Sequence, residues 1–573
     1  MNNQPEKKQR AVSRVWIVIS IVFIVLFAAS LVLDLRSLLG IEGKKVSIKD
    51  TKAAAKVIGL DFTDKELKLM IEDVRENLEA YQKLREHPLD NSVFPAVGFN
   101  PLIPFVSETV LEGKVNRIPV TLPEDPALTV PENIEDLAFA PVSVLARLIQ
   151  SRKITSTELT HIYLERLKRY DPVLKCVITL TEDLALAQAK KADEEIAAGH
   201  YRGPLHGIPW GAKDLLAVKG IKTTWGATPY KDQVIDVDAT VVKRLEDAGA
   251  VLVAKLSMGA LAWGDVWFGG ETKNPWNTEQ GSSGSSAGPG SATSAGLVGF
   301  SIGTETWGSI VSPSTRCGVS GLRPTYGRVS RYGAMALSWS MDKIGPICRS
   351  AEDCALVFNE IYGPDGIDFS LVDRPFTWDA SRDIKTLRIG YVKDLFAEDY
   401  TDKANDLKVL ETFRAMGIDL IPIKLPDFPV DSLSFILNAE AAAAFDELTR
   451  SGKDDLLVRQ VRYAWPNVFR QARLIPAVEY IQANRFRTLL IQQMAEILKD
   501  IDVYIVPSYG GNHLLLTNLT GHPAVVLPNG FNEKGSPTSI TIMGNLYKEA
   551  EALLVAKAFQ DATEFHKKRP PLK

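Results

Sequence analysis

From residue 134 to the C-terminus, short apolar runs alternate with longer segments in which apolar residues recur at helical spacing. Thr155–Glu158 has the form of a capping box before a helix, and residues 185–198 and 240–248 have the periodicity of two more helices. A short apolar run at Val251–Ala254 predicts a buried strand. Further strands are expected at 387–392, 502–506, 524–527 and 539–543, a last helix at 547–565 and a surface loop at 363–383. This alternation predicts an α/β fold with a central mixed β-sheet covered by helices on both faces.

The N-terminus follows a different pattern. Residues 1–14 form a basic tail, and an apolar run interrupted only by two serines follows at 15–33. As a helix this run would reach roughly 28 Å, about the hydrocarbon thickness of a bilayer. The pattern predicts an uncleaved transmembrane helix; a cleaved secretory signal and a buried globular helix are the alternatives. Because basic residues tend to stay cytoplasmic, we expect a single-pass membrane protein with its N-terminus in the cytoplasm and its bulk on the extracytoplasmic side, or a secreted or periplasmic protein after cleavage.

Residues 41–133 are expected to form an appendage that is partly helical and partly extended. Thr63–Glu66 again has capping-box form, and the apolar positions between Leu67 and Tyr81 fall on one helical face. His87–Pro88 ends this helix, and the Pro-rich residues that follow favour an extended segment. We expect the helix to pack on the main body of the protein; a gating or membrane-apposed element is the alternative.

The composition is that of a globular protein. Of the 573 residues 45% are apolar and 24% charged, and the formal net charge is −4. Lys and Arg do not gather in the patches that nucleic-acid-binding proteins carry, so no nucleic acid partner is expected. The four cysteines are too few for a disulfide scaffold and form no CxxC pair, which argues against structural zinc. No metal or cofactor is predicted.

A Gly- and Ser-rich stretch at 281–333 is the strongest candidate for a functional site. A flexible linker of this composition would lack large apolar residues, whereas Leu297, Phe300, Ile302 and Ile310 are threaded through this stretch. Small residues mixed with core residues predict backbone packed closely around a site that presents hydroxyl groups. A Gly-rich structural turn is the alternative.

This stretch resembles the signature of the amidase signature family of serine hydrolases. The family's GGSSGGS segment falls on Ser283–Pro289, and its GTDxGGS segment falls on Gly303–Ser309. The segment HGIPWGAKD at His206–Asp214 and the tail Asn518–Pro528 are similar to further family segments. The resemblance extends over roughly residues 134 to 571, and it implies an amidase signature fold for a catalytic domain at 134–573.

The resemblance implies a Ser-Ser-Lys triad. Ser309 would be the nucleophile, Ser285 the bridging serine after a cis peptide bond with Gly284, and Lys213 the base. The lysine would take a proton from Ser285, which takes it from Ser309, and the same relay would later deliver it to the leaving nitrogen. The oxyanion hole of the family would be formed by the backbone N–H groups of Thr306, Trp307, Gly308 and Ser309.

Chemistry adds an argument for Lys213. Serine is a weak nucleophile at its own pKa and needs a base, and a lysine acts as a base only when its pKa falls several units below about 10.4. The apolar and small residues at 208–212 suit a desolvated lysine, although Asp214 would keep the amine charged if it pointed the same way. On a strand the two side chains would face opposite ways. Without the resemblance, a lysine in such a run is more often a snorkelling surface residue.

Ser286 is a competing nucleophile. Gly284–Gly288 fits the GxSxG elbow with Ser286 at its centre, and a Ser-His-Asp triad there would need one of the seven histidines. The residues before it lack the β-branched run of the strand that the elbow requires. Ser286 is expected either to help orient Ser285 or to have a structural role only.

The sequence departs from the family pattern close to the predicted nucleophile. Trp307 stands where many members have Gly, and its ring is expected to shape or narrow the acyl pocket. Val311 stands where an Arg commonly follows the nucleophile by two, so any ion pair or substrate contact of that Arg is lost. Ala287 and Pro289 also differ, but none of these changes removes a group of the triad.

Three functions remain open at this point. The main prediction is a membrane-anchored amidase that hydrolyses the C–N bond of a small carboxamide, lipid amides included, through an acyl-enzyme. The first alternative is the glutaminase (A) subunit of a tRNA-dependent amidotransferase, which passes ammonia to a partner; the apolar N-terminus and Val311 argue against it. The second alternative is a non-catalytic membrane scaffold. Besides the substrate, the expected partner is the membrane through residues 15–33, and a homodimer is left open.

Overall fold

The computed structural model describes residues 46–57, 64, 67, 68, 71, 120, 122, 125, 127–368, 370–461, 463–473 and 475–572. The chain divides into two compact units, residues 1–89 and 90–573. The apolar run at 15–33, the basic tail before it and most of the predicted extended segment lie outside the described residues. In the part of the chain that is described, no helix has both the length and the apolar character needed to cross a bilayer.

The first unit contains helix α2, Ile48–Val57. Ser47 and Asp50 close its first turn, since the N–H and the hydroxyl of Ser47 donate to Oδ2 of Asp50 at 2.9 and 2.6 Å. Of the stripe predicted to begin at Leu67, the described residues Leu67 and Ile71 are helical and buried. The other positions of that stripe lie outside the described residues.

The second unit is built on a mixed sheet. Its strands are β1 (Val177–Leu180), β2 (Pro209–Lys213), β3 (Val251–Leu256), β8 (Phe300–Glu305), β9 (Ser320–Arg323), β10 (Lys343–Cys348), β11 (Ile389–Val392), β12 (Ile421–Ile423), β13 (Val503–Pro507), β14 (Ala524–Phe531) and β15 (Pro537–Gly544). They lie in the order β1-β3-β2-β8-β10-β9-β14-β15-β13-β11-β12. Strand β2 is parallel to both of its neighbours, β3 and β8, whereas β10 is antiparallel to β8 and β9.

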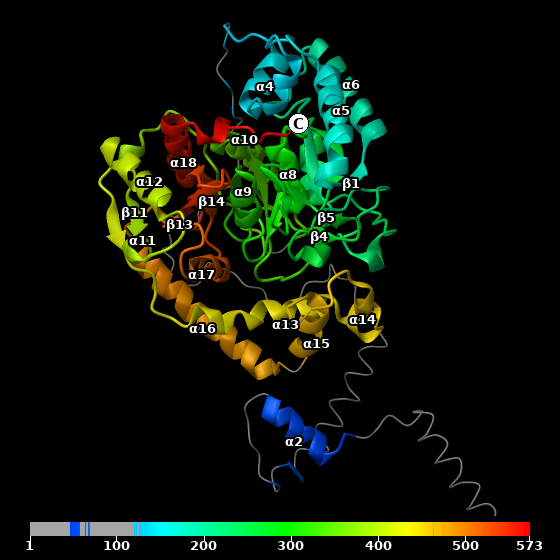
Figure 1. Ribbon diagram of the computed structural model, residues 1–573, viewed down its shortest axis with the longest axis vertical. Helices are drawn as coiled ribbons and strands as arrows, with labels where there is room; N and C mark the ends of the chain where they lie inside the picture. Colours follow the sequence, from blue (N-terminus) through cyan, green and yellow to red (C-terminus); the bar gives the residue numbers. More distant parts are fainter. Residues whose placement is uncertain are drawn as a thin grey trace, which may run out of the picture. The chain divides into compact units, whose positions relative to one another are not determined.

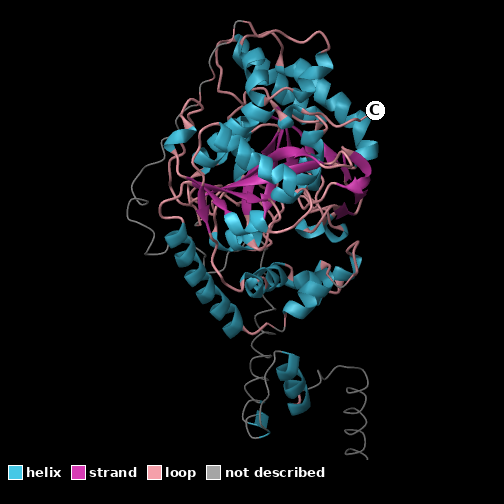
Figure 2. Cartoon of the chain, turned by 60° about the vertical axis from the view of Figure 1, so that its left-hand side comes forward, coloured by secondary structure: helices cyan, strands magenta, loops and turns pink. Residues whose placement is uncertain are grey.

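Helices cover both faces of this sheet (Figures 1 and 2). They are α4 (Val142–Gln150), α5 (Ser156–Leu174), α6 (Glu182–Ala197), α7 (Thr240–Asp247), α8 (Ala287–Ser294), α9 (Val311–Cys317), α10 (Ala351–Ile361), α11 (Lys393–Ala397), α12 (Lys403–Ala415), α13 (Phe435–Ala444), α14 (Asp446–Arg450), α15 (Trp465–Ala472), α16 (Ala477–Ile497), α17 (His513–Thr520) and α18 (Glu549–Thr563). Strand β3 illustrates the two layers: Val251 and Val253 pack into one apolar cluster, and Leu252 packs into another. Neighbouring residues of a strand face opposite ways, so both faces are buried. The predicted α/β fold with a helix-covered mixed sheet is confirmed.

The predicted elements of this unit lie close to their expected positions. Thr155 and Glu158 form the predicted capping box at the start of α5. Helices α13 to α16, which gather on one side of the second unit in Figure 1, were not predicted. In α16 the apolar side chains of Val478 and Ile481 are exposed and that of Leu490 is buried. Apolar residues therefore occur around much of this helix, and no single stripe marks it in the sequence.

Candidate active site

The predicted site residues lie at one edge of the sheet. Lys213 is the last residue of β2, a strand whose residues are all buried. Strand β8 runs parallel beside it, with Ala212 opposite Ile302, and therefore ends at the same edge. Ser285 lies between the ribbon strand β7 (Asn277–Gly281) and α8, and Ser309 lies between β8 and α9. Residues far apart in the sequence are thus carried to the end of two neighbouring strands.

The amine of Lys213 is fully buried among hydroxyl groups. Its Nζ lies 2.8 Å from Oγ of Ser285, 3.1 Å from Oγ of Ser286 and 2.9 Å from Oγ1 of Thr304. Burial lowers the pKa of Lys213 from 10.5 to about 7, against the opposing pull of the nearby carboxylates. The amine is therefore neutral in a large fraction of molecules at physiological pH, as a general base requires.

Asp214 does not compete for this amine. Its carboxylate lies 2.8 Å from Nζ of Lys255, and both side chains are fully buried. Oδ2 of Asp214 also accepts hydrogen bonds from the N–H and the hydroxyl of Thr224, at 2.8 and 2.5 Å. Asp214 lies in the turn just after β2, and its carboxylate is engaged by Lys255 and Thr224 instead of the Lys213 amine.

The bridging position has the backbone that the resemblance implied. The peptide bond between Gly284 and Ser285 is cis, and Ser285 is 1% exposed. A Cβ at position 284 would lie 1.9 Å from the carbonyl oxygen of Gly264. Glycine is required here because another segment of backbone passes directly against it.

Ser286 contacts Lys213, and among the described residues no histidine is bonded to it. Its Oγ accepts from Lys213 and from the N–H of Thr304 at 3.1 Å, and it donates to the carbonyl oxygen of Thr304 at 3.1 Å. The buried His513 and His522 have pKa values lowered to about 4 and about 3, chiefly by burial. A strand does precede Ser286, but β7 belongs to a two-stranded ribbon outside the main sheet. The contacts support an orienting role for Ser286.

Ser309 and the predicted oxyanion donors form the turn between β8 and α9. The carbonyl oxygen of Ser309 accepts from the N–H of Ser286 at 3.2 Å, and the Ser309 side chain is half-buried. Within the described residues, none of the N–H groups of residues 306–309 donates to another protein group. Gly308 has φ +88°, a left-handed conformation that favours glycine. Four N–H groups are thus left available in the turn that carries Ser309.

Glu305 holds this turn and was not recognised in the sequence. Its Oε2 accepts from the N–H groups of Ile310 and Val311 at 2.9 and 3.0 Å. Its Oε1 accepts from Arg323 at 2.7 Å and from Nδ2 of Asn518 at 2.9 Å. Burial raises the pKa of Glu305, but Arg323 and the hydrogen bonds outweigh burial and bring it to about 2. The sequence did hold a signal, since Glu305 stands at the acidic position of the family segment GTDxGGS, just before the predicted nucleophile.

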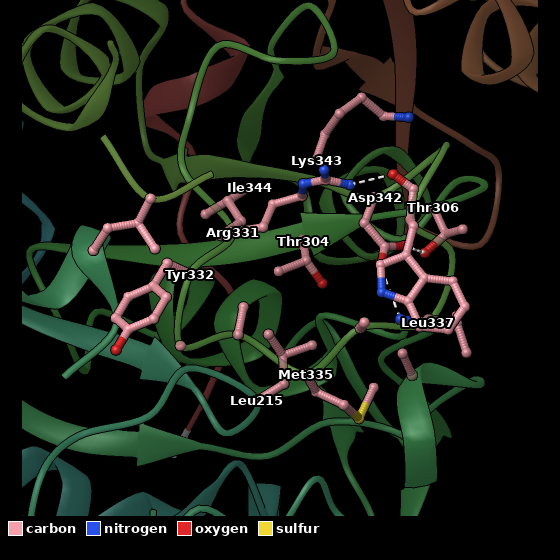
Figure 3. A pocket seen from close by; sticks show the side chains of 16 residues that line it. Leu215, Thr304, Thr306, Arg331, Tyr332, Met335, Leu337, Asp342, Lys343 and Ile344 are labelled. Carbon is pink, nitrogen blue, oxygen red and sulfur yellow. Dashed lines mark hydrogen bonds between the residues drawn. The ribbon is translucent and has the colours of Figure 1, made fainter. Parts of the chain in front are cut away.

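A cavity of about 160 Å³ lies beside Thr304, and Figure 3 shows the side chains that line it. Its wall includes Thr304, which is bonded to Lys213, and Thr306, whose hydroxyl donates to Asp342 at 2.6 Å. The remaining wall is mainly apolar, with Leu215, Met335 and Leu337 among its side chains. Trp307 does not line this cavity and is 42% exposed, so the expectation that its ring shapes the acyl pocket stays a prediction.

The fold and the site define a hydrolase that acts on carbon–nitrogen bonds. The chain belongs to the amidase signature family: the profile described as Amidase matches residues 158–514, more than half of the chain. The A subunit of glutamyl-tRNA(Gln) amidotransferase from Methylococcus capsulatus is 33% identical over 474 residues, 74% of this chain and 97% of the relative. Its counterpart from Coxiella burnetii is 32% identical over 480 residues, 75% and 99% of the two chains.

Solved structures of amidases have the same fold. The native peptide amidase from Stenotrophomonas maltophilia matches with a TM-score of 0.67 at 28% identity, over 75% of this chain and 98% of the other. An amidase family protein from Bacillus anthracis matches with a TM-score of 0.68 at 26% identity, over 76% and 93% of the two chains.

The relatives correct the main functional prediction. A membrane-anchored amidase was expected, and the similarity to glutamyl-tRNA(Gln) amidotransferase favours its first alternative instead. The single-pass membrane localisation inferred from residues 15–33 is overturned by the same relatives. An apolar run fixes how far a helix would reach, but it does not show that the helix enters a bilayer.

The exclusion of nucleic acid is also wrong, since these relatives are named for glutamyl-tRNA(Gln). A low net charge describes one chain only, and in a multi-chain assembly another chain can bind the RNA.

Proposed function

We propose that this protein is the glutaminase component of a tRNA-dependent amidotransferase. It hydrolyses the side-chain carboxamide of glutamine, a linear amide, and passes the ammonia to partner chains that amidate a tRNA-bound amino acid. The relatives support this proposal, because the match spans almost the whole length of the amidotransferase A subunits from two organisms. The chemistry rests on the Ser-Ser-Lys arrangement.

In this mechanism Ser309 Oγ attacks the carboxamide carbon while its proton passes to Ser285 and on to Lys213. The N–H groups of residues 306–309 stabilise the oxyanion; losing one such donor typically costs 10²–10³ in rate. Collapse of the tetrahedral intermediate breaks the C–N bond, and the proton returns through Ser285 to the leaving nitrogen, which departs as ammonia. Water then attacks the acyl-enzyme by the same relay and releases glutamate.

One observation carries the chemical part of the proposal: the buried amine of Lys213 lies 2.8 Å from the Ser285 hydroxyl and has a pKa lowered to about 7. A charged lysine could not accept the proton, and an amine with an ordinary pKa would be charged at pH 7. Ser286 and Thr304 hold this amine in place from two further sides.

The test is ammonia release from glutamine by the purified protein, first by itself and then together with glutamyl-tRNA(Gln) and the other chains of the amidotransferase. We expect release that increases when the partners are present and that is absent in Ser309→Ala. Hydrolysis of peptide carboxamides with no reaction on glutamine would overturn the glutamine assignment and leave the triad intact. Equal ammonia release by wild type and Ser309→Ala would overturn both the glutamine assignment and the triad.

A further inference from the structure

One loop supplies most of the wall of the cavity beside Thr304. It lies between β9 and β10, and its residues between 331 and 342 include the apolar Met335 and Leu337 (Figure 3). Asp342, the last residue before β10, is the only acidic residue of this wall within the described part of the chain. A carboxylate in a mainly apolar wall is costly unless it is hydrogen-bonded.

The carboxylate of Asp342 is bonded to two separate parts of the site. Its Oδ1 accepts from the hydroxyl of Thr306 at 2.6 Å. Its Oδ2 accepts from the N–H groups of Leu337 and Ser338 at 2.8 and 2.9 Å. Burial raises the pKa of Asp342, and these three donors oppose that shift because they stabilise the ionised form. Asp342 therefore ties the turn that begins at Thr306 to the loop that lines the cavity.

Thr306 is the first of the four residues whose N–H groups are expected to stabilise the oxyanion. Its side chain is 7% exposed, and its hydroxyl is held by Asp342. Farther along the same turn, Glu305 accepts from the N–H groups of Ile310 and Val311. Two carboxylates thus hold the turn at different points. Oxyanion donors stabilise a developing charge best when they are fixed before the reaction begins.

The loop that lines the cavity is also bonded to two helices. Glu440 of α13 accepts from the hydroxyl of Ser338 at 2.6 Å and from the N–H of Ser340 at 3.0 Å. Arg487 of α16 donates to the hydroxyl and to the carbonyl oxygen of Ser340, both at 2.8 Å. All four of these side chains are buried. Asp342 therefore connects the oxyanion turn to a wall that is itself held in place.

The charge of Asp342 also acts on the base of the triad. Burial lowers the pKa of Lys213 to about 7, and the carboxylates of Asp342 and Glu305 oppose burial by raising it. An anion close to an amine favours the ammonium form. The other charged groups next to these side chains are Arg323, paired with Glu305, Lys255, paired with Asp214, and Arg331 and Lys343 near Asp342. Removal of the negative charge at position 342 should therefore make Lys213 neutral at a lower pH.

We propose that Asp342 is a positioning residue for amide hydrolysis, which fixes the oxyanion turn through Thr306 and places a negative charge near the Lys213 amine. The bond to Thr306 affects how well the transition state is stabilised, and the charge affects the pH at which the base becomes active. The proposal rests on the hydrolysis at Ser309 proposed above, and it does not depend on glutamine as the substrate.

Three variants separate these effects in steady-state assays with glutamine and with p-nitrophenyl acetate over about pH 6 to 9. Asp342→Asn removes the charge and the acceptor at Oδ2. Thr306→Val removes the hydroxyl and keeps the backbone N–H, whereas Thr306→Ser keeps both. Asp379→Asn is the matched control, because exposed Asp379 also accepts from a hydroxyl and an N–H group, those of Ser381, and does not line the cavity.

In Thr306→Val we expect kcat to fall about tenfold with KM little changed, as loss of a charge-assisted hydrogen bond implies. The midpoint of its pH profile of kcat/KM should stay at about 7. Thr306→Ser should keep most of the wild-type kcat. In Asp342→Asn kcat should fall at least as much, and the midpoint should move to lower pH because Lys213 loses a nearby anion. Asp379→Asn should match wild type in both quantities.

An unchanged kcat in Thr306→Val would overturn the proposal. A midpoint in Asp342→Asn that equals that of wild type, or lies above it, would do the same. If Asp342→Asn does not fold, the two variants of Thr306 decide, and equal losses of kcat in Thr306→Val and Thr306→Ser would count against the hydroxyl.

The two substrates distinguish failure of this proposal from failure of the proposed function. A wild type that hydrolyses p-nitrophenyl acetate but not glutamine would overturn glutamine as the substrate, and the variants are then compared on the ester. Absence of turnover of either substrate by wild type would overturn the hydrolysis at Ser309 and the role of Asp342 with it.

Discussion

Replacing Lys213 by Met should abolish catalysis and change how stability depends on pH. The amine of Lys213 is buried against three hydroxyl groups, and burial lowers its pKa from 10.5 to about 7. At about 1.4 kcal/mol for each pKa unit, this shift corresponds to roughly 5 kcal/mol as an upper limit on the cost of burying the ammonium. Methionine has a similar length and no charge, so the variant removes that cost.

The direction in which the stability of wild type changes with pH depends on whether the folded or the unfolded chain holds the proton of Lys213. Below pH 7 the folded and the unfolded chain both carry a charged Lys213, and the full cost lowers the stability of wild type. Between pH 7 and about 10.4 the folded chain has lost the proton and the unfolded chain has kept it, so the cost falls as the pH rises. Lys213→Met should therefore gain stability relative to wild type as the pH is lowered from 10 to 6. The hydroxyl groups left behind lose a partner at about 1 kcal/mol each, which shifts the difference equally at every pH.

Urea unfolding of both proteins at about pH 6, 8 and 10, followed by tryptophan fluorescence, measures this difference. Lys255→Met is the control, because it removes a buried lysine that is paired with Asp214. It leaves a buried carboxylate alone, at a cost of about 3–5 kcal/mol, and should destabilise the protein. A difference between Lys213→Met and wild type that stays constant from pH 6 to 10 would refute the argument from the buried amine.

Three further outcomes are expected. Ser309→Ala should lose ammonia release and labelling by a fluorophosphonate probe while its melting temperature stays within about 2 °C of wild type; labelling of this variant would count against Ser309 as the nucleophile. The value of kcat/KM on glutamine should rise with pH through about 7 and then level off, because the neutral form of Lys213 is the base; a rate that falls over this range would contradict that role. Glu305→Gln should lower kcat by about ten- to a hundredfold with KM little changed, because it loosens the turn that carries the oxyanion donors. It should also destabilise the protein by about 3–5 kcal/mol, because Arg323 loses its partner. A change in KM with kcat unaltered would contradict this role of Glu305.

Much of the fold was readable because its signals are local. The capping box of Thr155 and Glu158 lies within one turn of helix, and the apolar run at Val251–Ala254 marks a strand that is buried on both faces. Helix α16 gave no such signal, since its apolar residues are not confined to one side. The position of α16 depends on packing against distant parts of the chain, and the spacing of apolar residues in the sequence gives no information on such contacts.

The site was only partly predictable for the same reason. Lys213 and Ser285 could be proposed from motifs, and the structure brings them within 2.8 Å. The importance of Glu305 depends on partners at 310, 311, 323 and 518 that converge only in the folded chain. Thr304, the third partner of the Lys213 amine, lies in a predicted site segment, yet nothing in the sequence shows that its side chain faces the lysine.

The most direct test of the account is the pKa of the Lys213 amine itself. Lysine labelled with ¹³C at the ε position allows each amine to be titrated by NMR, and the spectrum of Lys213→Met identifies the signal of Lys213 by its absence. The account predicts a signal that titrates near pH 7 in wild type. A Lys213 amine that remains charged up to about pH 10, as an exposed lysine does, would contradict it.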